Sequence, residues 1–176
     1  MPDPTQSMEA RLAELEARLA DLEAAEAIKN MKARYGSLVD ARYAHGDVVS
    51  REELERLAHE ITQLFTEDAI WDGGKGLGLC TGHEELRRRF AEPTLKFTRH
   101  YFVKPQIEVT GDTARAEWDV FAPCTRRDGK PYWMAGVEHD EYRREKGAWL
   151  HTRMQLDMVF LAPYERGWAW RPAPRE

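Results

Sequence analysis

Hydrophobic residues recur at helical spacing near the start of the chain. They follow one another in alternating steps of four and three, with Glu and Arg at most positions between them: Met8, Leu12, Leu15, Leu19 and Leu22. This pattern predicts a helix with a narrow a/d seam of about two heptads, because Glu26 and Lys29 occupy the next seam positions. Two interpretations stay open for this arm, residues 1–24. It packs on its own domain, or it is a self-association helix.

A second apolar stripe, shifted from the first, continues the helical register. Ile28, Met31, Tyr35 and Leu38 have the spacing of a helix face that packs on a core. Gly36 is expected to weaken this helix, so that it bends or ends there.

Two further helices are predicted by their start signals. Ser50-Arg-Glu-Glu53 is a capping box that opens an apolar stripe ending near Thr66, and Thr81-Gly-His-Glu84 is a second one that opens a helix to about Phe90. A short strand, 69–71, and a glycine-rich loop, 73–78, lie between them. The loop is expected to form a flexible rim.

Runs of period two dominate the chain after Pro93. They predict four half-buried antiparallel strands separated by turn signals, over 97–109, 113–123, 132–143 and 148–160. Helices followed by hairpin-connected strands indicate an α+β fold, in which a cone-shaped, curved antiparallel sheet wraps over the N-terminal helices. The predicted organisation is the arm, a cone domain over 25–170 and a tail over 171–176. Such a cone leaves a concave cavity, which is the usual place for a ligand.

Composition narrows the class of protein. Of the 176 residues 42% are hydrophobic and 32% charged, which excludes a disordered or low-complexity chain. The net charge is −5 and no basic stripe is present, so nucleic acid is not an expected partner. No run approaches the ~20 apolar residues of a membrane span, and the N-terminus has no leader pattern. Together with two cysteines that we expect to be free thiols, this predicts a cytoplasmic protein with no membrane partner.

Three polar residues stand out against the predicted elements. His100 shares a strand face with Thr98 and Phe102, where a hydrogen-bonded core histidine is the simplest reading. Asp40 ends the long helix, where a carboxylate has the wrong sign for the helix dipole. Tyr35 lies five residues, or about 140° of ideal helix, before Asp40, so both reach one cavity only if the helix bends or ends between them.

Other candidates rest only on their expected places along the strands. We name six as substrate-binding candidates: Tyr101, Trp118, Asp119, Trp133, Arg153 and Met154. The glycine-rich loop lacks the spacing of a phosphate-binding loop, the six histidines form no metal-ligand pair, and no serine or cysteine stands in a nucleophile motif. No metal and no cofactor are therefore expected.

The order of elements and several residue runs resemble a known family. The runs are Ile28 to Tyr35 with Val39-Asp40, Leu64 to Trp71, Arg99-His100, Ile107 to Ala114, Asp140 to Tyr142 with Gly147 to Trp149, and Pro163 to Trp168. They are similar to the SnoaL-like polyketide cyclases and dehydratases, which have a nuclear-transport-factor-like α+β cone. The resemblance covers about residues 27–168. It is most similar to the cofactor-independent lyases: bile acid 7α-dehydratase, scytalone dehydratase and hexachlorocyclohexane dehydrochlorinase.

The resemblance implies roles for three residues. Those lyases pair a helix-end Asp with a strand His, and Asp40 and His100 stand at the matching positions; Tyr35 matches a Tyr of the bile acid enzyme. The dehydrochlorinase's basic residue on the last long strand is replaced here by Met154, with Arg153 beside it. The 44–59 link is also longer than usual. Family members assemble through their sheet faces, which implies a homodimer or homotrimer.

The expected function follows from this chemistry. Asp40 would fix the tautomer of His100 and stabilise its imidazolium form, making His100 a general base, with Tyr35 as proton donor or oxyanion-hole donor. We therefore expect a dehydratase-type lyase that acts on a small, apolar, cyclic or aromatic hydroxylated molecule. An isomerase, a cyclase or a carbon–carbon lyase would use the same dyad. A non-catalytic ligand-binding or assembly module is the alternative from another class.

Overall fold

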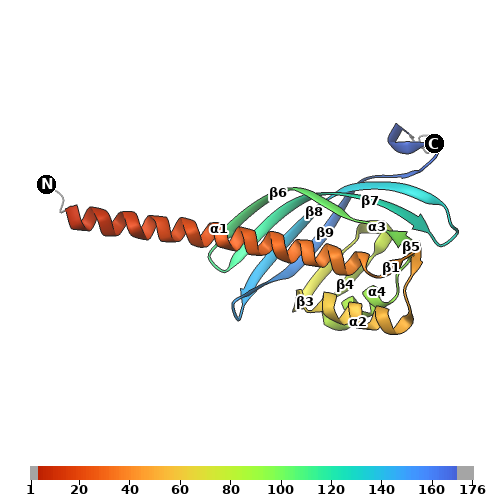
Figure 1. Ribbon diagram of the computed structural model, residues 1–176, viewed down its shortest axis with the longest axis horizontal. Helices are drawn as coiled ribbons and strands as arrows, with labels where there is room; N and C mark the ends of the chain where they lie inside the picture. The colour runs from red at the N-terminus through yellow and green to blue at the C-terminus, as the bar shows by residue number, and fades with distance from the viewer. Residues whose placement is uncertain (1–3, 170–176) are drawn as a thin grey trace.

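A computed structural model describes residues 4–169 of the chain, so the predicted tail, 171–176, lies outside the described residues. Figure 1 shows a long N-terminal helix lying across one face of a curved sheet, with the shorter helices gathered at one end of that sheet. None of the helices in the described part is both long and apolar enough to cross a membrane.

Helix α1, Pro4–Asp40, is continuous. Its residues from Ser7 to Glu23 are all exposed, and the next residue, Ala24, is buried. The expected bend at Gly36 is wrong, because the helix runs through this residue. A Cβ atom at Gly36 would lie 3.2 Å from the ring of Phe102. The absence of a side chain at Gly36 therefore allows the helix to pack closely against the sheet.

The shorter helices follow their predicted starts with differences in detail. A small hairpin of β1, Tyr43–Ala44, and β2, Asp47–Val48, precedes α2, Arg51–Thr62. Ser50 caps α2 by accepting a hydrogen bond from the Glu53 N–H group, as predicted. Helix α4, Gly82–Ala91, begins where expected, but the side chain of Thr81 makes no cap. The expected rim loop contains a short helix, α3, Gly74–Leu77.

The main sheet has seven strands and is open and mixed. Its strands are β3, Phe65–Asp72; β4, Leu79–Thr81; β5, Leu95–Thr98; β6, Tyr101–Thr110; β7, Thr113–Arg126; β8, Pro131–Glu145; and β9, Ala148–Pro163, followed by a 3-10 turn, Gly167–Ala169. The order is β4-β3-β9-β8-β7-β5, with β6 also paired to β7. The expectation of an antiparallel sheet is wrong at one place, because β3 runs parallel to β9. Leu64 and Phe65, assigned to a helix by their spacing, lead into this parallel strand.

Alternation of side chains sets the inner face of the sheet. On β7 the buried residues are Ala114, Ala116, Trp118, Val120, Ala122 and Cys124, which confirms the alternation expected for this strand. The register between β8 and β9 shifts near Tyr142, so that His151 faces inward before the shift and Met154 after it. One extra residue in a strand reverses the facing of all that follow.

A buried ion cluster joins α1 to the sheet. The Lys32 ammonium lies 2.5 Å from Glu138 Oε2 and 2.7 Å from Asp140 Oδ2, both on β8. Burial acts to lower the pKa of Lys32, but the two carboxylates outweigh it and raise this pKa above 10.5. Burial and the neighbouring Asp140 raise the pKa of Glu138, although Lys32 opposes them. Two carboxyl groups thus share one ammonium.

His151 is buried next to this cluster. Its ring stacks on Phe65 at 4.9 Å and tilts against Tyr142 at 4.7 Å. Neither ring nitrogen has a hydrogen-bond partner among the described residues, and Nδ1 lies 3.9 Å from Asp140 Oδ2. Burial lowers the pKa of His151 from 6.5 to about 3. The imidazole is therefore neutral in the folded protein at neutral pH.

We expect Lys32→Met to lower the free energy of unfolding by about 3–5 kcal/mol, because it leaves two buried carboxylates without their cation. Urea unfolding at pH 7.5 measures this change. Lys29→Met is the matched control on the same helix, since its partner Glu26 is exposed, and it should change the free energy by less than about 1 kcal/mol. Equal effects of the two substitutions would contradict the role of the cluster.

We expect His151 to make the fold sensitive to acid. The unfolded chain binds a proton at His151 near pH 6.5 and the folded chain only near pH 3, so stability is complete above pH 6.5 and falls below it. From pH 7.5 to pH 5 this group should remove on the order of 2 kcal/mol. Urea unfolding of wild type and His151→Phe at both pH values tests this. The variant should lose less stability than wild type, whereas a variant of the exposed His139 should behave as wild type.

Candidate active site

Asp40 and His100 meet where the end of α1 reaches the link between β5 and β6. His100 Nδ1 lies 2.7 Å from Asp40 Oδ1. The backbone N–H of His100 also donates to both carboxylate oxygens, at 3.1 and 3.2 Å. The Asp40 side chain is only 4% exposed, and the Arg99 guanidinium approaches it at 3.3 Å. The helix end thus delivers a buried carboxylate to the ring and the backbone of one histidine.

This contact determines which ring nitrogen of His100 is basic. An ionised carboxylate accepts hydrogen bonds but donates none, so the short contact assigns the hydrogen to Nδ1. Nε2 is then the basic nitrogen of the neutral ring. The His100 ring also lies parallel to the Phe102 ring, with centroids 5.8 Å apart, which limits its rotation.

Tyr35 lies in the same region, although the helix does not bend. It is 4% exposed, with ring centroids 5.9 Å from Phe65 and 6.2 Å from Phe90. Burial raises the pKa of Tyr35 above its ordinary value of 10. Its hydroxyl therefore stays protonated and can act as a hydrogen-bond donor.

His100 and Tyr35 line one cavity of about 70 Å³ between the helices and the inner face of the sheet. Glu138, Met154 and Leu156 line it from β8 and β9, and Leu77 of α3 contributes to its wall. Apolar and aromatic side chains, among them Val39, Tyr43, Trp71, Phe90 and Met134, form much of the remaining wall, together with the polar Arg42, Asp72, Arg89, Thr94 and Thr98. The cavity thus combines a histidine held by a carboxylate, a phenol and a second carboxyl group.

Sequence reasoning missed Lys32, Glu138, Asp140 and Tyr142. The Tyr142 hydroxyl donates to Asp140 Oδ2 at 2.7 Å and accepts a hydrogen bond from the Trp118 indole at 3.2 Å. Buried lysine and glutamate are rare unless they are paired, and these partners lie 106 and 108 residues apart in the chain. One sequence signal was available. Glu138 and Asp140 lie on the same face of the predicted strand 132–143 as the apolar residues Met134 and Tyr142, which indicates that both carboxyl groups point inward.

Of the six substrate-binding candidates, the structure brings only Met154 to this cavity. Trp118 faces inward but packs with Tyr142 and Trp149 in a neighbouring part of the core. Asp119 and Arg153 point to the opposite face of their strands from Trp118 and Met154. Asp119 pairs with Lys104, and Arg153 lies 3.8 Å from Asp72. Tyr101 is 52% exposed.

Trp133 also has the outward parity on β8, next to the buried Met134. Its ring stacks on Phe121, with centroids 5.6 Å apart, and tilts against Tyr164 at the same distance. It therefore belongs to an aromatic group outside the cavity.

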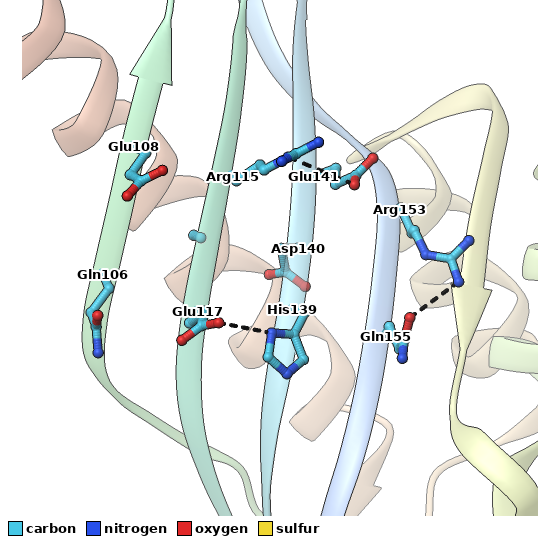
Figure 2. Close-up of a pocket in the computed structure, with 10 residues that line it drawn as sticks. Gln106, Glu108, Arg115, Glu117, His139, Asp140, Glu141, Arg153 and Gln155 are labelled. Atoms are coloured by element: carbon cyan, nitrogen blue, oxygen red, sulfur yellow. Dashed lines mark hydrogen bonds and ion pairs between the residues drawn. The ribbon is translucent and has the colours of Figure 1, made fainter.

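A larger, polar basin of about 350 Å³ lies on the outer face of the sheet. Figure 2 shows most of its side chains on the face turned away from α1, with His139 reaching toward Glu117 and Arg153 toward Gln155, while Asp140 points to the helix side. His139 lies 3.1 Å from Glu117 and 3.4 Å from Asp157. The charged groups on this face are partly exposed and pair with one another, and the buried acid at the basin, Asp140, is already engaged by Lys32 and Tyr142. The smaller cavity around His100 is the better candidate site.

The chain matches the family described as SnoaL-like domain over residues 20–155. A search of curated proteins gives no match. Within the described residues, no group of three or more His, Cys, Asp or Glu side chains is placed to hold a metal ion.

Solved structures resemble the chain over most of its length. One is a Novosphingobium aromaticivorans protein provisionally named an aromatic ring hydroxylase, with 25% identity and a TM-score of 0.67 over 81% of this chain and 94% of that chain. Another is the type 2 hexachlorocyclohexane dehydrochlorinase LinA, with 21% identity and a TM-score of 0.66 over 88% and 97%. A third, also from N. aromaticivorans, is provisionally named a scytalone dehydratase, with 19% identity and a TM-score of 0.66 over 88% and 96%. The α+β fold is thereby confirmed, and the match across 20–155 shows that the chain belongs to the SnoaL-like domain family.

Proposed function

We propose that the protein is a cofactor-independent lyase, a dehydratase that removes water from a cyclic or aromatic hydroxylated small molecule. The observation that carries this proposal is the 2.7 Å contact between Asp40 and His100 at the wall of the cavity. This contact orients the His100 ring and leaves its Nε2 as the base. Tyr35 and Glu138, which line the same cavity, can each donate a proton. Membership of the SnoaL-like family supports a lyase or isomerase type of reaction.

His100 begins the reaction. Its Nε2 takes a proton from a carbon next to a carbonyl or another acidifying group of the substrate. The electron pair of that C–H bond forms a carbon–carbon double bond, the adjacent C–O bond breaks, and the hydroxyl leaves with a proton as water. Asp40 stabilises the imidazolium that forms. General base and acid steps of this kind each contribute about 10²–10⁴-fold to the rate.

Two side chains can protonate the leaving hydroxyl. Tyr35 is the donor that we favour, because its buried phenol stays protonated and lines the cavity with His100. Glu138 is the second, because it lines the same cavity and its pKa is raised by burial and by Asp140. A protonated Glu138 would donate its proton to the leaving hydroxyl, and the Lys32 ammonium would then stabilise the resulting carboxylate.

The cavity favours a compact ring as substrate. Its walls are mostly apolar and aromatic, and its volume of about 70 Å³ is well below the ~300–1,000 Å³ of sites for drug-sized ligands. Binding of even one ring therefore requires the wall to open. Leu77 lies on the short helix α3, which begins at Gly74 and is followed by Gly78, and we propose that this part of the wall moves. The names of two structural neighbours, which refer to hexachlorocyclohexane and to an aromatic ring, agree with such a substrate.

We further propose that the enzyme is a homodimer or homotrimer in the cytoplasm. The outer face of the sheet carries paired charges such as Glu117 with His139, and β9 exposes apolar residues such as Val159, which suits contact between copies. Cys80 and Cys124 are free and buried, as is usual for a reducing compartment.

We expect His100→Ala to lower the rate of water loss by about 10²–10⁴-fold, since it removes the base. Asp40→Asn should also lower the rate, because an amide can present its N–H to the ring and disturb the tautomer. A panel of hydroxylated cyclic compounds, followed by absorbance and mass spectrometry, measures this. His139→Ala on the outer face is the control and should keep the wild-type rate. A loss below tenfold in His100→Ala would refute the assignment.

The pH dependence of the rate separates the two donors. If Glu138 donates, the rate falls as pH rises through its raised pKa, and Glu138→Gln removes this fall together with much of the rate. If Tyr35 donates, the rate shows no fall at the raised pKa of Glu138, because the phenol stays protonated there, and Tyr35→Phe lowers the rate about 10²-fold at every pH. We expect the second result. Exchange of the substrate's acidic hydrogen for deuterium without loss of water would indicate an isomerase instead.

A further inference from the structure

The N-terminal part of α1 carries an apolar seam that the domain leaves uncovered. Exposure ranges from 46% at Leu15 to 73% at Met8, with Leu12, Leu19 and Leu22 between these values. Figure 1 shows this part of the helix projecting beyond the sheet. Of the two interpretations of residues 1–24, packing on the chain's own domain is therefore not the one observed. An exposed apolar stripe of this kind usually marks a contact with another molecule.

The charges beside the seam identify the partner. With Leu12 and Leu19 at a positions and Met8, Leu15 and Leu22 at d positions, the g positions hold Arg11 and Arg18. The e positions hold Glu9, Glu16 and Glu23. In a parallel coiled coil, a g residue meets the e residue five places further on in the other helix. Arg11 then meets Glu16 of a second copy, and Arg18 meets Glu23.

Other arrangements fit the same charges poorly. In an antiparallel pair, g faces g and e faces e, which would set Arg against Arg and Glu against Glu. A membrane surface is disfavoured as well, because the segment 8–25 holds five acidic residues against two arginines, and amphipathic membrane helices are rich in Lys and Arg. The b and f positions hold Ala10, Ala13, Ala17 and Ala20, so no second apolar seam competes.

We propose that residues 8–22 form a parallel coiled coil with the same segment of a second copy of this chain. Two heptads are short for a coiled coil made by free peptides, because helix formation has a costly first turn. Here that turn already exists: α1 is continuous into the packed part of the domain, where Ala24 and Ile28 are buried. Pairing of the arms therefore does not have to start a new helix. It only has to bury the apolar seam of a helix that the domain already forms.

Disulfide cross-linking of the full chain tests both the pairing and its direction. In a parallel coil Met8 faces Met8, so Met8→Cys should give a covalent dimer under mild oxidation, several-fold more than Ala17→Cys at the outer f position. Met8→Cys combined with Leu15→Glu and Leu19→Glu should lose the dimer. The native cysteines are buried, and the unaltered chain measures their background. Equal cross-linking of Met8→Cys and Ala17→Cys, or none from Met8→Cys, would overturn the proposal.

Charge exchange gives a second readout that does not touch the apolar seam. The change Arg11→Glu with Arg18→Glu should raise the dissociation constant of the arm contact at least tenfold, measured by sedimentation. Adding Glu16→Arg and Glu23→Arg should restore it, because the g–e pairs are then re-formed with opposite signs. No restoration would contradict a parallel pairing. Since the cavity lies within one cone, catalytic rates are read separately, and failure of this proposal leaves the dehydratase proposal untouched.

Discussion

The ammonium group of Lys32 sits between two carboxylates of β8, and this buried contact fixes where α1 rests on the sheet. Eight residues further along the same helix, about 12 Å by helical rise, Asp40 makes a second buried contact with His100. A charge cannot leave water without a partner at acceptable cost. The helix therefore has one position along the sheet at which both contacts form. Glu138 and His100, which meet these two helix residues from the other side, also line the cavity.

The stability of the fold and the chemistry proposed for the site thus depend on the same charges. The cluster holds one carboxyl group more than it has cations, and its excess acid, Glu138, faces the cavity. In the proposed reaction His100 gains a positive charge as it takes the substrate's proton. An anionic carboxyl group across the cavity stabilises that charge, and a protonated one returns the proton to the leaving group. The neighbouring His151, neutral and fully buried, adds no competing cation.

Features that depend on neighbouring residues in the chain were predictable from the sequence. Contacts between residues far apart in the chain were not. The cap at Ser50 and the alternation along β7 depend on neighbours in the chain, and both agree with the structure. The parallel pairing of β3 with β9 has no local signature, since periodicity shows which face is buried but not which strand lies alongside. Lys32 has the sequence appearance of a solvated helix residue, because its partners lie more than a hundred residues away. The shift that turns Met154 inward and Arg153 outward depends on one extra residue in β9.

Gly36 shows how one residue serves fold and site together. Its missing side chain lets the Phe102 ring approach the helix, and that ring also lies parallel to His100 and beneath the Lys32 ammonium, 4.4 Å from the ring centre. The helix therefore continues without a break over the sheet, and its N-terminal part projects beyond the domain. Any pairing of the N-terminal arms must then set the relative orientation of two cones, because a rigid helix transmits its direction. The arm and the cavity are connected by this one helix but lie at opposite ends of it, so the proposed assembly and the proposed chemistry can change independently.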